Sequence, residues 1–174
     1  MFNNLKKINT QEDILYNKIL LLSRNKLFFT KFDLGDTFQN RIYLIFLHIS
    51  FLFIKIKRAS QKEIYKVFYQ KMFDLIFNNI ELNMREIGYG DTVTNKNMKF
   101  LVKTFYDILL SCENFNKSSL NLKKMFFLKY LKLNNMKKKA NNVSLIEYFD
   151  KYQAFCFDLS SDSVLKGDLN FKYK

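Results

Sequence analysis

Three ionisable side chains lie beside two glycines in the short segment that contains Arg85, Glu86, Gly88, Gly90 and Asp91. The chain has only four glycines and no proline, so two glycines this close together predict a break in the backbone. Gly88 is expected to take the left-handed conformation that ends a helix, and Gly90 to let the chain turn again. The resulting corner would hold a guanidinium and two carboxylates in fixed positions, where they can form ion pairs.

The arginine of this corner has several candidate partners. Arg85 and Glu86 are adjacent, so they point to different sides of a helix, which argues against a simple pair between them. Arg85 is expected to pair with Asp91 or Asp36, or with a carboxylate of a partner protein. An internal salt bridge that braces the corner and an anchor for a partner are equally compatible with the sequence. Arg41, early in an apolar segment, is also expected to have a fixed carboxylate or carbonyl partner.

Catalysis is not indicated by the residues around the corner. Residues 88–91 match the G-x-G-D of intramembrane aspartyl proteases, but that chemistry needs two aspartates on membrane-embedded helices. A nucleotide-binding loop would need a preceding strand and a third glycine. His48, the only histidine, is expected to be a hydrogen-bonded core residue, with haem ligation by His48 and a methionine as the alternative. No catalytic residue, metal site or cofactor is predicted.

A long helix is predicted to lead into the corner. Apolar residues recur at helical spacing over residues 61–87, after a capping box of Ser60 and Glu63. The helix that follows the corner is expected to begin at Thr94 or Asn95, where a polar side chain precedes a second apolar stripe. The corner is therefore predicted to join two helices.

An earlier helix is predicted to lie at the centre of the fold. Asp36 is expected to cap it, with Gln39 three residues on as in a capping box. Residues 42–54 are apolar almost all round, which is typical of a helix surrounded by others. This run has about thirteen residues, whereas a membrane span needs roughly 20, so a buried core helix is expected.

The rest of the chain is also predicted to be helical. Strand patterns with a period of two are nearly absent. The expected fold is an all-α single helical bundle of about six helices, with residues 1–174 forming one domain. The other helix signals are capping residues at Thr10, at Ser118 or Ser119, at Ser144 with Glu147, and at Ser161 before Gly167.

The positive charge of the chain is unevenly distributed. The net charge is +13, and residues 114–146 contain eight lysines and no acid. Such a segment attracts polyanions, so a basic RNA-binding or ribosome-associated helical module is the alternative function. The interleaved aromatics are expected to face the core, and the lysines to give a nonspecific attraction to RNA or anionic lipid. The predicted basic patch consists of Lys117, Lys123, Lys124, Lys129, Lys132, Lys137, Lys138 and Lys139.

Cysteine usage and the first residues bear on the compartment. Cys112 and Cys156 are too few for a disulfide framework and are expected to be small buried hydrophobes in a reducing compartment. Residues 1–13 contain no long apolar run and no arginine, which predicts neither a secretory signal nor a transit peptide.

Two segments carry a resemblance to a known family. Residues 83–98 (N-M-R-E-I-G-Y-G-D-T-V-T-N-K-N-M) and residues 35–48 (G-D-T-F-Q-N-R-I-Y-L-I-F-L-H) resemble the signature of the ubiquinol–cytochrome c chaperone family. These proteins are assembly factors for cytochrome b of respiratory complex III. Flanking pieces are similar in the same order, so the resemblance covers roughly residues 14–171. Asp107, where the family usually has glycine, and the lysine-rich stretch depart from it.

The resemblance implies a chaperone and not an enzyme. It would bind newly made cytochrome b until haem and partner subunits are in place, and would lie in the cytoplasm, peripheral to the inner membrane, or on the matrix side in an organelle. The ribosome, a small partner chaperone subunit and an anionic membrane are the further partners considered. The client-binding or motif residues are expected to be Asp36, Arg41, His48, Asn83, Arg85, Glu86, Gly88, Gly90, Asp91 and Lys96.

Overall fold

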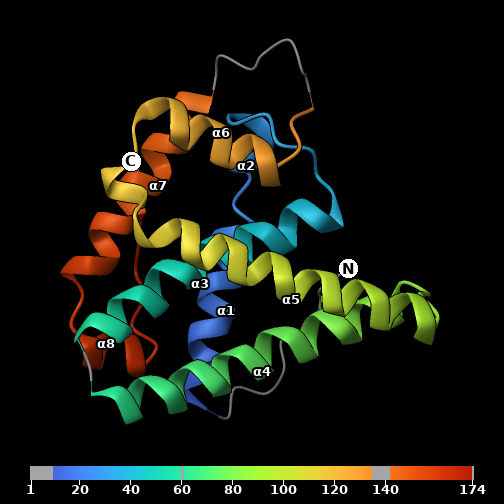
Figure 1. Cartoon of the computed structure of the whole chain (residues 1–174), viewed down its shortest axis with the longest axis horizontal. Coiled ribbons are helices and arrows are strands. Elements are labelled where there is room, and N and C mark those ends of the chain that lie inside the picture. The colour runs from blue at the N-terminus through green and yellow to red at the C-terminus, as the bar shows by residue number, and fades with distance from the viewer. Residues whose placement is uncertain (1–9, 60, 135–141, 174) are drawn as a thin grey trace.

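The structure is a computed structural model that describes residues 10–59, 61–134 and 142–173. These residues form α-helices and one 3-10 helix, η1, and no strand beyond an isolated bridge between Leu34 and Leu133 (Figure 1). Two of the α-helices are short, α2 with four residues and α8 with five, and the other six are longer. The predicted all-α bundle of about six helices is confirmed. The elements are α1 (Gln11–Ser23), α2 (Leu27–Thr30), α3 (Phe38–Ala59), α4 (Lys62–Glu86), α5 (Asp91–Glu113), η1 (Phe115–Lys117), α6 (Leu120–Tyr130), α7 (Asn142–Asp158) and α8 (Ser161–Leu165).

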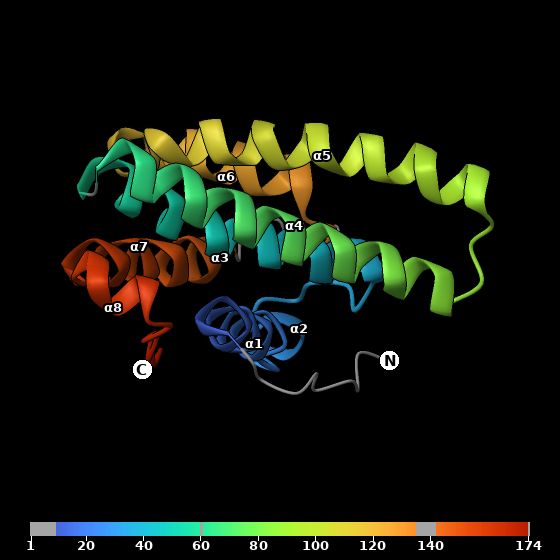
Figure 2. The same cartoon turned by 90° about the horizontal axis from the view of Figure 1, so that it is seen from below.

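The apolar helix α3 lies at the centre, as predicted. Helices α1, α4, α5 and α7 all pack against it, with α1 and α2 on one side and α5 and α6 on the other (Figure 2). Neighbours on every side leave α3 no solvent-facing stripe, which explains its all-round apolar pattern. By length and composition α3 would suit a membrane span, but 83% of its most apolar window is buried inside the protein. It is the core helix of this fold.

The one histidine is part of this core. His48 is fully buried, and its Nδ1 lies 2.6 Å from the Leu44 carbonyl oxygen. A carbonyl only accepts, so Nδ1 carries the proton, and Nε2 accepts from the Tyr148 hydroxyl at 2.9 Å. The Tyr152 hydroxyl donates to the His48 carbonyl at 3.2 Å. Both ring nitrogens are therefore satisfied within the fold.

The predicted start of α3 is wrong by one residue. The Thr37 hydroxyl, rather than Asp36, accepts the hydrogen bond of the Asn40 amide at 3.1 Å. The Asp36 carboxylate is turned towards Arg41 instead, and a charge-assisted pair with a guanidinium is the stronger interaction. Gln39 donates to the Tyr43 hydroxyl and takes no part in a capping box.

Other predicted helix ends also differ from the structure. Helix α5 begins at Asp91 and not at Thr94 or Asn95, because Gly90 already has the extended backbone of an N-cap residue. Helix α7 begins before Ser144, and α4 begins with Gln61 as its N-cap, while Ser60 lies outside the described residues. A polar residue near a helix start therefore does not identify the N-cap in this chain when a neighbouring residue can occupy that position.

The end of α6 is set by contacts with the start of α3. The helix ends at Tyr130, and the chain then turns to pair with the segment before α3. The Gly35 amide donates to the Lys132 carbonyl at 2.9 Å. The buried Asn40 side chain bridges the same place, donating to the Lys132 carbonyl and accepting from the Lys132 amide.

Candidate functional site

The corner between α4 and α5 is built as the glycine pattern predicts. Gly88 has φ +95°, and its amide donates to the Arg85 carbonyl at 3.0 Å. The next amide, of Tyr89, donates to the Met84 carbonyl at 3.0 Å. These two bonds form a Schellman motif, which ends a helix around a left-handed glycine. Gly90 is then the N-cap residue of α5, so a helix adjoins the corner on both sides.

The guanidinium of Arg85 forms ion pairs with two carboxylates at and near this corner. It pairs with Asp91 and, through Nε at 3.1 Å and Nη2 at 2.9 Å, with Glu81. The hydrogen bond that Arg85 donates to Asp91, with a smaller contribution from those it donates to Glu81, raises the pKa of Arg85 above its usual value. Glu81 was not among the predicted partners, although its position four residues before Arg85 on the same helix could have indicated it. The internal salt bridge is thus the arrangement observed.

Asp36 and Arg41 form a separate ion pair. Arg41 Nε lies 2.7 Å from Asp36 Oδ1 and Arg41 Nη2 lies 3.0 Å from Oδ2, and the guanidinium stacks over Phe29 of α2 at 5.3 Å. This hydrogen bonding lowers the pKa of Asp36. In the described part of the chain, no hydrogen bond or ion pair joins this pair to Arg85, so the two predicted clusters are distinct.

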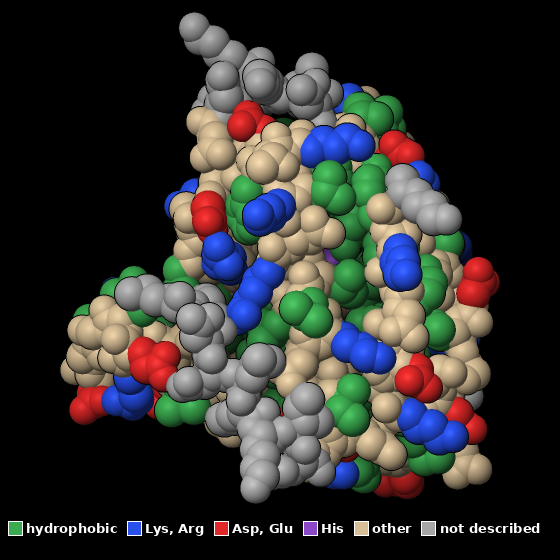
Figure 3. Space-filling view, turned by 180° about the vertical axis from the view of Figure 1, so that it is seen from behind, with side chains coloured by type: hydrophobic (Ala, Val, Ile, Leu, Met, Phe, Trp, Pro, Cys, Tyr) green, Lys and Arg blue, Asp and Glu red, His purple; other side chains and the backbone are tan. Residues whose placement is uncertain are grey.

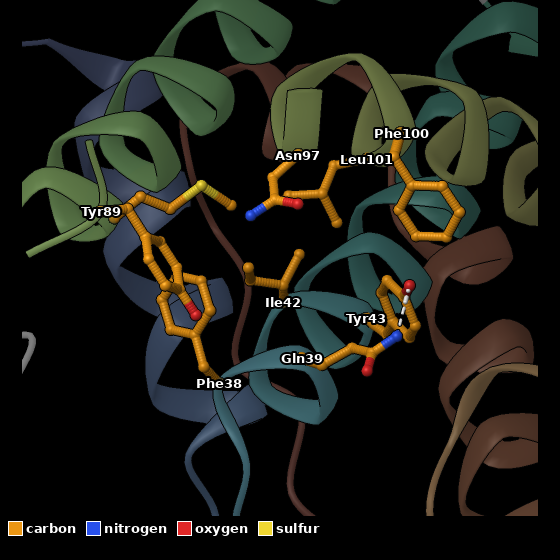
Figure 4. A pocket seen from close by; sticks show the side chains of 9 residues that line it. Phe38, Gln39, Ile42, Tyr43, Tyr89, Asn97, Phe100 and Leu101 are labelled. Carbon is orange, nitrogen blue, oxygen red and sulfur yellow. Dashed lines mark hydrogen bonds between the residues drawn. The ribbon is translucent and has the colours of Figure 1, made fainter. Parts of the chain in front are cut away.

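A hollow of about 280 Å³ adjoins the corner. Figure 4 shows that its walls come from the start of α3, the end of α4, the corner and α5. Tyr89, which lies between the two glycines, lines the hollow together with Phe38 (Figure 4). The lining residues are Phe38, Gln39, Ile42, Tyr43, Met84, Tyr89, Asn97, Phe100 and Leu101.

The hollow combines exposed aromatic side chains with an amide. Tyr89 is 41% exposed and Phe100 57%, whereas Ile42, Met84 and Leu101 are buried beneath them. The Asn97 side chain points between these walls (Figure 4) and has no hydrogen-bond partner among the residues that the structure describes. Such a site can take up apolar side chains of another polypeptide and bond to its backbone.

The other predicted residues are placed as follows. His48 is in the core and has no surface with which to contact a partner. The Asn83 side chain donates to the Asn79 carbonyl at 2.6 Å, within α4. Glu86 and Lys96 are exposed and form no ion pair within the described ranges. Both side chains are therefore accessible to a partner.

The residues that form the hollow were not predicted. Tyr89, Asn97 and Phe100 lie on the corner and on α5, and only their packing against α3 brings them together. Phe100 carried a signal in the sequence, because it is a large apolar residue outside the buried stripe of α5 that contains Leu101 and Phe105.

One lysine of the predicted basic patch does not lie on the surface. Lys123 is buried between α6 and α7, where its Nζ lies 2.5 Å from Asp150 and 4.7 Å from the centre of the Phe115 ring. Its charge is thus neutralised within the fold. Lys117, Lys129 and Lys132 are exposed and Lys124 is half-buried, while Lys137, Lys138 and Lys139 lie outside the described residues. Figure 3 shows that Lys and Arg side chains are also spread over the face that carries α1.

Serine substitutions distinguish the two glycines of the corner. Gly88→Ser is expected to destabilise the protein by about 1 kcal/mol, because serine at a positive φ is strained. Gly90→Ser is expected to be neutral or slightly stabilising, since φ there is −69° and serine is a good N-cap. Thermal unfolding checks this, with a fall of roughly 2–4 °C expected for the first variant only. Equal losses for the two variants would show that Gly88 does not fix the corner through its conformation.

Comparison with known proteins gives two matches. The sequence profile described as "Ubiquinol-cytochrome C chaperone" matches residues 30–171, well over half of the chain. The fold is similar to the crystal structure of the Cbp3 homolog from Brucella abortus, with a TM-score of 0.77, 20% sequence identity, and coverage of 94% of this chain and 89% of that one. No curated protein matches the sequence significantly.

Proposed function

This chain belongs to the ubiquinol-cytochrome C chaperone family, and we propose that it holds newly made cytochrome b during the assembly of respiratory complex III. The hollow beside the Arg85 corner receives an apolar segment of this client. The family supports the role in assembly, and the hollow supports a place for the client. The protein acts by binding, and no bond is made or broken in this role.

The observation that carries the binding site is the exposed Phe100 beside the unpaired Asn97 amide. An aromatic side chain that is 57% exposed gains free energy when a client covers it, because its apolar surface leaves water. The amide offers a donor and an acceptor to the backbone of an inserted segment. The hollow therefore favours an apolar stretch of polypeptide over a small charged ligand.

The corner serves this site by keeping it open. Arg85 joins the last turn of α4 to the first residue of α5 through Glu81 and Asp91. Tyr89 and Met84, which line the hollow, lie on either side of the glycine that this pairing braces. In this role Arg85 positions the walls, and the exposed Glu86 and Lys96 remain available for charges of the client.

Client capture tests the proposed function. Cytochrome b labelled during translation is expected to co-purify with the tagged chain, and Tyr89→Ser combined with Phe100→Ser is expected to reduce the captured amount about tenfold, by removing two partly exposed aromatic anchors. Leu21→Ser, at a residue 70% exposed on α1, is the matched control and should capture normally. Circular dichroism establishes that each variant is folded.

Variants of the Arg85–Asp91 ion pair then test whether these residues position the walls of the hollow or contact the client directly. Arg85→Ala and Asp91→Ala are expected to weaken capture less than the aromatic double variant. Undiminished capture by the folded aromatic variant would reject the hollow as the client site. Absence of cytochrome b from the capture by the unmodified chain would reject the function itself.

A further inference from the structure

Helix α6 exposes much of its apolar surface. Phe127 and Tyr130 are buried, as expected for an amphipathic helix, but four large apolar side chains of this three-turn helix point outward. Met125 is 67% exposed and Leu122 58%, and the other two are Leu120 at 50% and Leu128 at 41%. The same side of the molecule is hollowed where Leu122 and Met125 meet Ser111 of α5 and Phe115 of η1. This face has no partner in the described chain.

The same face of α6 is positively charged. Lys124 and Lys129 lie among the exposed apolar residues, Lys117 precedes the helix and Lys132 follows it. Residues 114–146 include no acid, and among the described residues none of Lys117, Lys124 and Lys132 forms an ion pair. Asp107 of α5 interacts electrostatically with Lys129. Asp150 of α7 is already paired with Lys123.

We infer that this outer face of α6 docks on an anionic phospholipid surface. The leucines and the methionine enter the boundary between headgroups and acyl chains, while the lysines reach the lipid phosphates. Interspersed aliphatic side chains and lysines fit this occupant better than they fit RNA, because base recognition uses exposed aromatic side chains for stacking. On α6, Phe127 and Tyr130 are buried and Phe126 is half-buried, so the exposed apolar residues are aliphatic.

The position of α6 allows membrane docking and client binding at the same time. Figure 2 shows α6 beside α5 on the side of α3 opposite α1. The corner lies at the far end of α4 and α5, away from α6, in both Figure 1 and Figure 2. Docking through α6 thus leaves Tyr89 and the corner accessible, and the inference does not depend on cytochrome b being the client.

A single tryptophan tests insertion directly, because the chain contains none. With Met125→Trp, vesicles of phosphatidylcholine and phosphatidylglycerol in equal parts are expected to shift the fluorescence to shorter wavelength, and brominated acyl chains to quench it. Vesicles of phosphatidylcholine alone should have a much smaller effect. Leu21→Trp, on α1, is the matched control and should show neither change. An unshifted Met125→Trp spectrum, or an equal shift at Leu21→Trp, would overturn the inference.

Charge variants identify the anionic partner. Lys124→Gln combined with Lys129→Gln is expected to weaken binding to the anionic vesicles about tenfold in flotation, and high salt should reduce this difference. Binding of the unmodified chain to single-stranded RNA without any flotation with vesicles would identify RNA as the partner and reject the membrane. An unchanged vesicle affinity in the double lysine variant would also reject it.

Discussion

Lowering the pH from 6.5 to 4 is expected to cost the folded chain roughly 3 kcal/mol of stability through His48 alone. Burial lowers the pKa of this imidazole from 6.5 to about 4. Between these values the unfolded chain binds a proton that the folded chain excludes, so stability falls as the pH falls. Above pH 6.5, where His48 is neutral in both the folded and the unfolded chain, this loss of stability is absent. Below about pH 4, where it is protonated in both, the loss does not increase further.

Two measurements check this prediction. Because His48 is the only histidine, the Hε1 proton of its ring gives a single assignable NMR signal, which is expected to show the neutral form down to about pH 4. Urea unfolding should show a steeper loss of stability over this range in the unmodified chain than in His48→Leu, which is less stable at neutral pH but cannot titrate there. A parallel pH dependence of the two proteins would contradict the assignment to His48.

Gly167→Ala is expected to destabilise the protein by about 2–4 kcal/mol. Gly167 has φ +78° and forms the Schellman motif that ends α8. A Cβ atom there would lie 3.0 Å from Ile14 Cγ2 and 3.1 Å from the Gln11 carbonyl oxygen, so it would press on the backbone of α1. The strain of a positive φ and the collision with a rigid helix therefore add.

Gly88→Ala provides the matched comparison. Gly88 also has a positive φ, but a Cβ there would meet nothing within 4 Å, so only the conformational cost of about 1 kcal/mol is expected. Chemical unfolding measures the free energy of unfolding of the two variants. The difference between them is the cost of the contact between the new methyl group and α1. A Gly167→Ala protein as stable as Gly88→Ala would show that the C-terminal segment is not held tightly against α1.

The parts of the fold that depend on one segment were predictable from the sequence. The central position of α3 was predicted from its all-round apolar pattern. The corner was predicted from Gly88 and Gly90, which follow the long apolar stripe of α4. Helix starts were less predictable because a cap depends on competing partners. Asp36 is a residue type that caps helices, but its carboxylate pairs with Arg41, and Thr37 caps the helix instead.

Contacts between distant segments account for what the sequence did not predict. The sequence around Lys123 suggests an exposed lysine, but in the fold Asp150 of α7 lies next to it and pairs with it. The hollow is similar, because Ile42, Met84 and Phe100 come from three helices and share no local pattern. A large apolar residue outside the buried stripe, such as Phe100, is the one local signal of such a site.

The most direct test of the client site is photo-crosslinking in cells that make cytochrome b. A photoreactive residue at Phe100 or Tyr89 is expected to give newly made cytochrome b as the main adduct, because both side chains are exposed at the hollow. The same probe at Leu21, which is more exposed but lies on α1, is expected to give little of this adduct. Cytochrome b crosslinked as strongly from Leu21 as from Phe100, or from neither position, would contradict the account.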